Sequence, residues 1–572
     1  MGAPPGSPVP ARRRRFGRVH RPGSDGIGAW WLVAAVLPLA FLVLFFAWPV
    51  AAMLWRGISA EGAVDLSAFA EVLGRERTWR ILGQTLGMAA AGTVVAVVVG
   101  LPAAFVLYRR DFPGRALLRG IITVPFVLPT VVVGVAFRAL LGPGGPLDFL
   151  GLDQTTAAVV LAFVFFNVSV VVRQVGHVWS SLDPKQTEAA RTLGASSFRA
   201  FRTVTLPQLG PAIAAAAALV FLFCSAAFGI VQTLGRPGYG TLETEIWVQT
   251  AVYLDLRTAA VFSTLQFAVV VAAVGLSGFA ASRTRRALRL RDAPRTPLRR
   301  GDAVPVAFTA AVAALILTPL VTLVVRSLRK NGQFSLENYR LLATSTGTGF
   351  TGGTTVAEAL EHSLKIALDA TALTLLAGVP LALLLTRAFR SSTARTAQRW
   401  LDGAVMLPLG VSAVTVGFGF VVSLRVQWPE LAASGALVPA AQAVVALPLV
   451  VRTLVPVLAA VDPRLREAAA TLGANPWRRL RTVDGPFLLR GVGLAAGFAF
   501  AVSLGEFGAT SFLASPDYVT LPIIIVRLLG RPGADNYGMA LAGAVVLAVV
   551  TAAVMMICER LRPTGAGRGG PW

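Results

Sequence analysis

Long apolar runs constrain the fold of this chain of 572 residues more than any other feature of its sequence. A helix needs about 20 mostly apolar residues to cross the hydrocarbon core of a bilayer. Hydrophobic residues make up 55% of the chain and charged residues only 14%, which is far from the usage of soluble domains. The sequence therefore predicts an all-α membrane protein with about twelve transmembrane helices. They are expected near residues 30–54, 86–107, 121–141, 156–178, 211–232, 258–281, 304–325, 363–386, 404–424, 436–458, 491–512 and 538–558.

One stretch of the chain occurs twice. Residues 183–207 read DPKQTEAARTLGASSFRAFRTVTLP, and residues 462–486 read DPRLREAAATLGANPWRRLRTVDGP. The two copies are separated by one offset (462 − 183 = 279), and weaker similarity continues on both sides, so we interpret the chain as an internal duplication. With six predicted spans in each copy, both halves would enter the bilayer in the same direction, as a parallel repeat.

The first part of each copy predicts a short capped helix. Asp183 and Asp462 stand at N-cap positions, and each is followed by a proline, which the first helical turn tolerates. Gly194 and Gly473 are expected to end these helices in the left-handed conformation, which glycine adopts without steric cost.

The second part of each copy predicts another short helix. Ser196 and Asn475 can cap it, and Pro207 and Pro486 are expected to end it. Helices of about ten residues are marginal on their own in water, because nucleation is costly. These pairs of helices therefore need a docking surface.

The repeated stretch resembles the cytoplasmic signature of the membrane subunits of binding-protein-dependent ABC importers. The shared pattern is Glu-Ala-Ala, three residues, Gly and a later Pro. It is carried by Glu188, Ala189, Ala190, Gly194 and Pro207, and again by Glu467, Ala468, Ala469, Gly473 and Pro486. In that family the first helix is a coupling helix seated in a groove of the ATPase. The resemblance implies two ATPase-coupling loops that begin at Asp183 and Asp462. The alternative is a surface loop that was duplicated with its domain and has no dedicated partner.

Two six-span halves in one chain resemble the fused permeases of the ferric-iron and thiamine importers. The stretch from Ser503 to Gly508 adds to this likeness. The resemblance implies a multi-pass protein of the bacterial plasma membrane that works with two copies of an ATP-binding ABC subunit and with an extracytoplasmic solute-binding protein. It leaves the solute open between iron(III) and thiamine.

The net charge of +24 reflects topology rather than nucleic-acid binding. If both termini and both repeated loops face the cytoplasm, the arginine-rich runs gather on that side, as the positive-inside rule requires. The predicted organisation is a cytoplasmic basic tail, a first repeat, a cytoplasmic basic linker, a second repeat and a cytoplasmic tail. Their boundaries are 1–29, 30–282, 283–303, 304–558 and 559–572.

The chain has no residues arranged for catalysis. An ATP-binding loop ends in Gly-Lys, whereas none of the three lysines, Lys185, Lys330 and Lys365, follows a glycine. The three histidines are scattered through the chain and form no metal-ligand pattern. We therefore expect no enzyme activity, cofactor or metal site in this chain, and an ATPase on a separate polypeptide.

Polar residues inside predicted spans are candidates for the translocation pathway. Asn167 could instead form hydrogen bonds between helices, and Asp369 could pair with Lys365 one turn earlier. Glu506 has no cation nearby in sequence and is the stronger pathway candidate, although a pair with Arg527 is an alternative. An ion-driven secondary carrier of twelve helices is the alternative function, but it would have no use for the repeated cytoplasmic loop.

Overall fold

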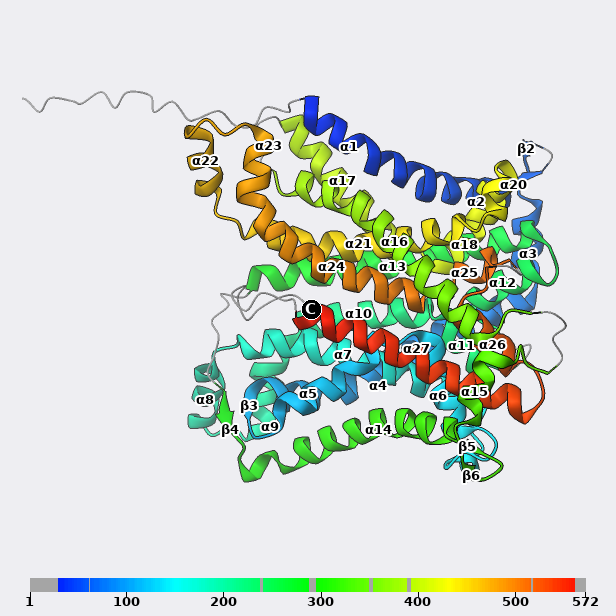
Figure 1. The fold of residues 1–572 in the computed structure, drawn as a ribbon. Coiled ribbons are helices and arrows are strands. Elements are labelled where there is room, and N and C mark those ends of the chain that lie inside the picture. Colours follow the sequence, from blue (N-terminus) through cyan, green and yellow to red (C-terminus); the bar gives the residue numbers. More distant parts are fainter. Residues whose placement is uncertain are drawn as a thin grey trace, which may run out of the picture.

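The protein is described from a computed structural model, which defines residues 29–60, 62–236, 240–287, 295–348, 353–387, 392–515 and 518–560. The predicted basic tail as far as residue 28, linker residues 288–294 and the C-terminal residues from 561 lie outside the described residues. Within the described ranges, ten helices are long and apolar enough to cross a membrane, and two bent pairs bring the total to as many as twelve. This agrees with the predicted all-α membrane fold (Figure 1).

The first half has six membrane-spanning units with short elements between them. The spanning elements are α1 (Ala29–Leu42), η1 (Val43–Ala47), α2 (Trp48–Ile58), α4 (Glu76–Arg109), α5 (Arg115–Thr123), η2 (Val124–Val127), α6 (Thr130–Leu141), α7 (Thr156–Ser180), α9 (Ser197–Ala200), η4 (Phe201–Thr205), α10 (Leu206–Ser225) and α13 (Leu256–Ala287). The short elements are β1 (Ser59–Ala60), β2 (Ala63–Val64), α3 (Ser67–Gly74), β3 (Arg110–Asp111), η3 (Asp148–Leu150), α8 (Pro184–Thr192), α11 (Phe228–Leu234) and α12 (Leu242–Ala251).

The second half repeats this order. Its spanning elements are α14 (Ala303–Ser327), α16 (Val356–Leu385), α17 (Ser392–Gly410), α18 (Ala413–Val422), α19 (Leu424–Gln427), α21 (Leu437–Ala459), α23 (Pro476–Arg479), η6 (Leu480–Asp484), α24 (Gly485–Gly505) and α27 (Ala534–Arg560). The short elements are β4 (Thr296–Pro297), η5 (Arg300–Asp302), β5 (Arg329–Lys330), β6 (Gln333–Phe334), α15 (Glu337–Thr344), α20 (Pro429–Ala433), α22 (Pro463–Thr471), α25 (Thr510–Leu513) and α26 (Leu521–Leu529).

Two predicted spans are broken rather than straight. The helices in 115–141 bend by 108° at Leu128-Pro129, and those in 395–427 bend by 93° before Ser412. A proline disfavours the helical conformation of the residue before it, and the Ser412 side chain caps the new helix α18. Backbone that is not helical at membrane depth is tolerated where protein or a water-filled cavity surrounds it. The two broken segments are therefore expected to lie inside the protein rather than against lipid.

The first span of each half packs against the other half. The first spanning unit, α1 to α2, contacts α16 and α18, while α14 contacts α4, α5 and α6. Phe45 stacks on Phe420 with ring centroids 6.1 Å apart, and Arg326 donates to the carbonyl of Ala139 at 2.7 Å. The two repeats are therefore intertwined.

Glycines allow close helix packing at matching places in the two halves. A Cβ on Gly100 of α4 would lie 2.9 Å from the Cβ of Val171 in α7. A Cβ on Gly378 of α16 would lie 2.8 Å from Val450 Cγ1 in α21. Helices α4 and α16 both continue through the prolines that follow, Pro102 and Pro380. Gly100 and Gly378 therefore allow α4 and α16 to pack closely against α7 and α21, and the prolines two residues later do not end either helix.

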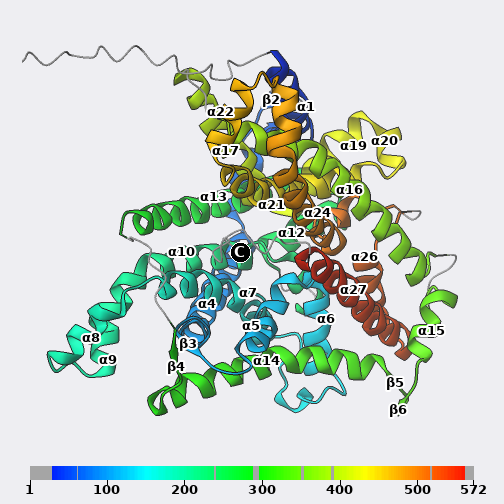
Figure 2. The same ribbon diagram turned by 60° about the vertical axis from the view of Figure 1, so that its left-hand side comes forward.

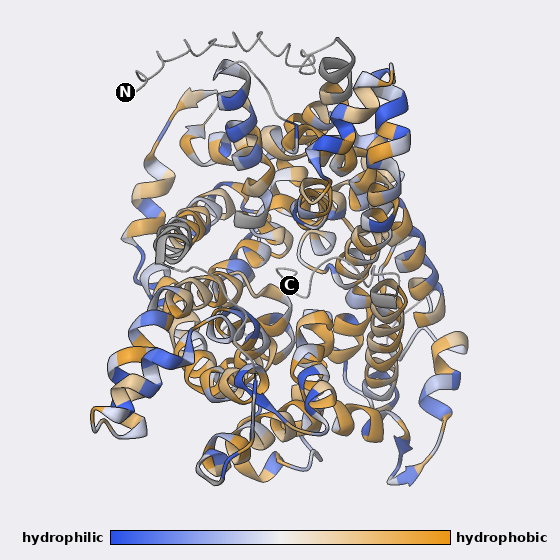
Figure 3. Ribbon diagram, turned by 90° about the vertical axis from the view of Figure 1, so that its left-hand side faces the viewer, coloured by the Kyte–Doolittle hydropathy of each residue, from blue (hydrophilic) through white to orange (hydrophobic). Residues whose placement is uncertain are grey.

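The two ends of the bundle carry different short elements. The elements α8, α9, α22 and α23 lie at one end, and the hairpins β1–β2 and β5–β6 lie at the other (Figure 1). Each hairpin leads into a short helix, α3 or α15, so the repeat extends further than the sequence similarity that we found. In Figure 2, α8 and α9 lie on one side of the molecule and α22 on the other. Figure 3 faces this end and shows hydrophobic helices through the body, with hydrophilic stretches around the rim.

Candidate functional site

The two predicted coupling helices, α8 and α22, have the same caps. The carboxylate of Asp183 accepts a hydrogen bond from the backbone N–H of Lys185 at 3.0 Å, and Asp462 accepts one from Arg464 at 2.9 Å. Beyond the helix ends, Gly194 has a φ of +88° and Gly473 a φ of +77°. The predicted caps and the left-handed glycines are therefore confirmed.

The helices that follow differ from the prediction. Ser196 accepts from the backbone of Arg199 at 3.3 Å and Asn475 from Arg478 at 2.8 Å, so the predicted N-caps are present. The prediction that Pro207 and Pro486 end these helices is wrong. Each short helix runs through a five-residue π-helical turn into the next span, where the proline occupies the first turn. A proline there needs no backbone partner, so the helix continues.

The coupling loops expose apolar side chains that the sequence analysis missed. Leu193 and its counterpart Leu472 are 89% and 87% exposed. Phe198 and its counterpart Trp477 are also exposed, at 73% and 59%. Paired apolar side chains on a projecting polar loop mark a protein interaction surface. Their recurrence at the 279-residue offset was the signal available in the sequence.

The signature residues themselves lie on the same surface. Those that are exposed are Glu188, Ala189, Gly194, Pro207, Glu467, Ala468, Gly473 and Pro486, whereas Ala190 and Ala469 are half-buried. Each loop thus exposes a glutamate and a leucine. The arrangement suits docking of one partner surface to each loop.

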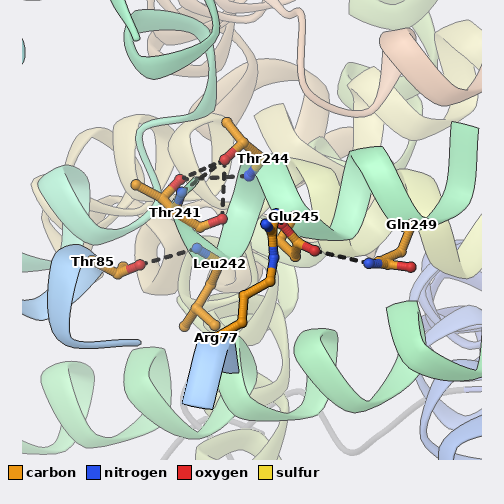
Figure 4. Close-up of polar contacts among 7 residues, drawn as sticks. All are labelled: Arg77, Thr85, Thr241, Leu242, Thr244, Glu245 and Gln249. Atoms are coloured by element: carbon orange, nitrogen blue, oxygen red, sulfur yellow. Dashed lines mark hydrogen bonds and ion pairs between the residues drawn. The ribbon is translucent and has the colours of Figure 1, made fainter. Parts of the chain in front are cut away.

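At the opposite end, helix α12 is fastened to α4 by polar contacts (Figure 4). The backbone N–H of Leu242 donates to Thr85 Oγ1 at 3.0 Å, and Arg77 forms an ion pair of 2.9 Å with Glu245. The second half repeats the first of these contacts, because Leu521 donates to Ser363 Oγ at 2.7 Å. These contacts fix the start of α12.

The start of α12 presents a carboxyl group to the other half of the chain. Glu243 is fully buried, and its Oε2 accepts a hydrogen bond of 2.9 Å from Ser412 Oγ at the start of α18. Its other oxygen, Oε1, makes no hydrogen bond of good geometry in the described part of the chain, although the Gln266 side chain lies close to the carboxyl group. The sequence analysis missed Glu243 because it lies between predicted spans. Its counterpart in the second half is Pro522 (243 + 279 = 522), so the repeat gave no signal.

Glu506 lies at a helix break rather than within a span. The helix α24 ends at Gly505, and Glu506 is 7% exposed. Its carboxylate accepts hydrogen bonds from the backbone N–H groups of Ala509 and Thr510 at 2.8 and 3.0 Å, and from the Thr510 hydroxyl at 2.5 Å. Its charge is thus held by the start of α25, and the alternative pair with Arg527 does not occur among the ion pairs of the described residues.

The two halves meet at a stacked aromatic pair. Phe228 and Phe507 are counterparts in the repeat (507 − 228 = 279), and their rings stack with centroids 5.2 Å apart and 15° between the planes. Both side chains are buried. Equivalent residues of two similar halves can touch only near the axis that relates them. This pair therefore marks the axis, and Glu506 is adjacent to it.

The two carboxyl groups both lie near the start of α18. Ser412 contacts Glu243, and the next residue, Ala413, is close to Gly508. A Cβ on Gly508 would lie 3.0 Å from Ala413 Cβ and 3.4 Å from Glu506 Oε1. One acid from each half thus lies near the same helix start.

The other polar candidates lie elsewhere. Asn167 is buried in α7 and donates to the carbonyl of Phe163 at 3.0 Å and to Cys224 Sγ in α10 at 3.4 Å, as expected for a contact between helices. The predicted pair of Asp369 with Lys365 is wrong. Lys365 pairs instead with Glu361 at 2.5 Å, one turn towards the start of α16, and Asp369 is exposed.

Comparison with known proteins gives the family. The chain matches the "Binding-protein-dependent transport system inner membrane component" family twice, over residues 96–331 and 378–564, which together exceed half of its length. The thiamine transport system permease protein ThiP of Brucella abortus (strain 2308) is 27% identical over 552 residues, 92% of this chain and 95% of that protein. ThiP of Escherichia coli (strain K12) is 26% identical over 525 residues, 88% of this chain and 90% of that protein.

A shorter relative matches one half of the chain. The putative 2-aminoethylphosphonate transport system permease protein PhnU of Salmonella typhimurium (strain LT2) is 28% identical over 270 residues, which are 44% of this chain and 92% of that protein. The duplicated loops, the repeated helix order and the double family match therefore agree. The chain belongs to the family of binding-protein-dependent transport system inner membrane components, as a fused permease that carries the family's domain twice.

Proposed function

We propose that this chain imports thiamine across the plasma membrane. It is a permease of a binding-protein-dependent ABC importer, and the observation that supports thiamine is its full-length similarity to permeases named for thiamine transport. Iron(III), the other solute that the sequence suggested, has no such support among these relatives. Thiamine carries a positive charge, which suits the two buried carboxyl groups beside the axis.

Energy comes from a separate ATPase, bound as two copies. Each coupling loop presents the same set of groups at the same end of the molecule: an exposed glutamate, an exposed leucine and an exposed aromatic side chain. Because the two loops have the same caps and the same glycine conformation, one kind of ATPase surface can bind both. ATP-driven closure of the ATPase pair would then move the loops together and open the interface between the halves in alternation.

The end with the coupling loops faces the cytoplasm, and the extracytoplasmic solute-binding protein docks at the other end. The positive-inside rule supports this orientation, and it places both termini in the cytoplasm. The hairpins β1–β2 and β5–β6 with helices α3 and α15 then form the outer face. A pocket of about 410 Å³ lined by Trp55, Arg56 and Arg257 opens near the first hairpin, away from the central carboxyl groups.

The pathway follows the axis marked by Phe228 and Phe507. The aromatic pair closes it, and the carboxyl groups of Glu506 and Glu243 lie near the start of α18. Burial raises the pKa of Glu243 to about 8, so a bound cation would favour its ionised form. A carboxyl group at membrane depth is costly unless it is hydrated, hydrogen-bonded or paired. Oε1 of Glu243 and Oε1 of the neighbouring Gln266 both lack a hydrogen-bond partner in the described residues, and a cationic solute would interact with both oxygens. Asn167 holds α7 against α10 beside the pathway and does not contact the solute, because its amide donates hydrogen bonds within its own helix and to α10.

Reconstitution tests the solute. The purified chain, its ATPase and its binding protein are placed in liposomes, and uptake of labelled thiamine is measured with ATP and with a non-hydrolysable analogue. We expect uptake that requires ATP and the binding protein. Uptake of iron(III) but not of thiamine in a parallel assay would refute thiamine as the solute.

Replacement of exposed leucines tests the docking surface. The double substitution Leu193→Ser and Leu472→Ser should release the ATPase during purification, since both side chains are almost fully exposed and make docking contacts rather than core contacts. The control is Val64→Ser, an exposed apolar position on the opposite end. Full retention of the ATPase by the double variant would show that these loops do not bind it.

A further inference from the structure

The second coupling loop contains a buried ionic cluster. The Asp484 side chain is fully buried, and it accepts one hydrogen bond from Arg387 Nη2 at 2.7 Å and another from Arg466 Nε at 2.8 Å. Both arginines are mostly buried, with 11% and 19% of their side chains exposed. Hydrogen bonds between charged groups are shorter and stronger than neutral ones.

This cluster joins three elements of the second half. Asp484 is the last residue of η6, which leads directly into α24. Arg466 belongs to the coupling helix α22, and Arg387 follows the cytoplasmic end of α16. Arg466 also donates to the carbonyl of Leu458 near the end of α21, at 3.1 Å. The coupling helix is thereby tied to three spans at once.

The first half has no such cluster at the matching positions. Thr205 replaces Asp484 and Thr187 replaces Arg466 (484 − 279 = 205; 466 − 279 = 187). The two hydroxyl groups are 3.4 Å apart. Arg109, the counterpart of Arg387, donates instead to the backbone carbonyl of Leu182 at 3.2 Å. Gln208 of α10 also donates to Gln186 of α8 at 2.8 Å. The first coupling helix is therefore joined to its spans by hydrogen bonds, with no buried carboxylate between two arginines at the matching positions.

The ionic cluster and the threonine pair differ in the free energy needed to separate them. Separating a buried carboxylate from its arginines leaves uncompensated charge, which is strongly unfavourable. Separating two threonine hydroxyls costs far less, because the net stabilisation by a hydrogen bond between neutral groups is small. The ionic cluster therefore holds α22 to α16 and α24 more firmly than the threonine pair holds α8 to the start of its span.

We propose that Asp484 is a positioning residue that makes the second coupling loop the stiff one of an unequal pair. It locks α22 to α16 and α24, so that the second half follows the ATPase closely while the first half follows with more freedom. This inference rests on the coupling role proposed for the two loops. It adds that the two ATPase copies do unequal mechanical work on the permease.

Hydrogen–deuterium exchange of the permease alone in lipid nanodiscs tests the stiffness. We expect residues 463–484 to exchange at least about tenfold more slowly than residues 184–205, after correction for intrinsic rates. The double substitution Asp484→Thr and Arg466→Thr copies the first half, whose contacts the fold already accommodates, and should remove the difference. Equal exchange of the two loops in the unmodified protein would overturn the proposal.

The reverse transfer serves as the matched control. Thr205→Asp with Thr187→Arg builds the cluster beside Arg109 in the first half, and it should slow exchange of residues 184–205 towards the rate of the second loop. If the double substitution in the second half prevents folding, this variant still decides the matter. Unchanged exchange in the first loop would contradict the proposal.

The complex with the ATPase tests the consequence. In the variant Asp484→Thr with Arg466→Thr, stimulation of ATP hydrolysis by the binding protein should fall at least about threefold relative to the unmodified complex, with the ATPase still bound. Unchanged stimulation would refute a positioning role. The exchange experiment needs neither solute nor ATPase, so failure of thiamine uptake would refute the proposed solute and leave the stiffness result intact.

Discussion

At the scale of single residues, the carboxyl groups of Glu506 and Glu243 differ in the hydrogen bonds that they form. Both carboxylate oxygens of Glu506 accept hydrogen bonds at the start of α25, from two backbone N–H groups and one hydroxyl group. Glu243 accepts one hydrogen bond from Ser412 and keeps its second oxygen buried without a partner among the described residues. Glu506 therefore has a structural task that Glu243 lacks.

Substitution by glutamine should separate these tasks. Glu506→Gln should lower the unfolding temperature, because the amide nitrogen cannot accept a backbone hydrogen bond and leaves a buried donor unsatisfied, at a cost of about 1–3 kcal/mol. Glu243→Gln should leave thermal stability unchanged, since its carbonyl can still accept from Ser412. It should instead weaken uptake of a cationic solute at limiting concentration by about tenfold, the effect of about 1.4 kcal/mol.

Thermal unfolding and uptake measured on the same preparations check this pair of expectations. Glu243→Asp is the control that retains the ionisable carboxyl group and should keep part of the uptake. If Glu243→Gln destabilises the protein and transports normally, Glu243 is a structural residue and the pathway needs another source of charge.

At the scale of elements, close contact between α4 and α7 depends on a missing side chain. Gly100→Ala should destabilise the protein by about 1–3 kcal/mol, because the added methyl would overlap the rigid Cβ of Val171. Gly87 lies on the same helix with nothing within 4 Å of an added Cβ, so Gly87→Ala should be neutral or slightly stabilising. Thermal unfolding of the two variants measures the difference, and equal stability would show that α4 can shift at no cost.

The coupling loops depend on the backbone conformation of their glycines. Val at Gly194 or Gly473 should impair ATPase docking more than Asn, because positive φ penalises a β-branched residue most, and nothing lies within 4 Å of an added Cβ at either site. Co-purification of the ATPase with each variant measures this. Equal retention with Val and Asn would show that the loops do not need the left-handed turn.

At the scale of the whole molecule, the exchange of first spans makes the halves one body. Each half packs against a span that the other half supplies, because α1 and α2 contact α16 and α18 while α14 contacts α4, α5 and α6. The same arrangement sets the helices α8, α9, α22 and α23 at one end of the bundle and both hairpins at the other (Figure 1).

Cysteine labelling tests this orientation. In a background without Cys224 and Cys558, Gln333→Cys on the second hairpin should react with an impermeant reagent added to spheroplasts, which gives it access to the outer face of the plasma membrane. Lys185→Cys on the first coupling helix should react only after lysis. Both positions belong to exposed loops, so accessibility on the protein is not limiting. Labelling of residue 185 in intact spheroplasts would reverse the proposed topology.

The sequence by itself determined the features that depend on neighbours along the chain. Run length and hydrophobicity gave the spans, and the caps at Asp183 and Asp462 followed from contacts only two residues apart. The importer class followed from the duplicated stretch and its family resemblance, which are also properties of the sequence alone. The coupling and pathway roles of particular residues stay predictions until the experiments above are done.

Only the tertiary structure decided the contacts between distant parts of the chain. Glu243 meets Ser412 across 169 residues, and Asp484 meets Arg387 across 97. Apolar periodicity does not encode which helices touch in a bilayer, because lipid and a neighbouring helix are equally apolar. The bends before α6 and α18, the exchange of first spans and the unequal coupling loops therefore emerge only when the helices pack, since packing alone selects which polar groups face one another.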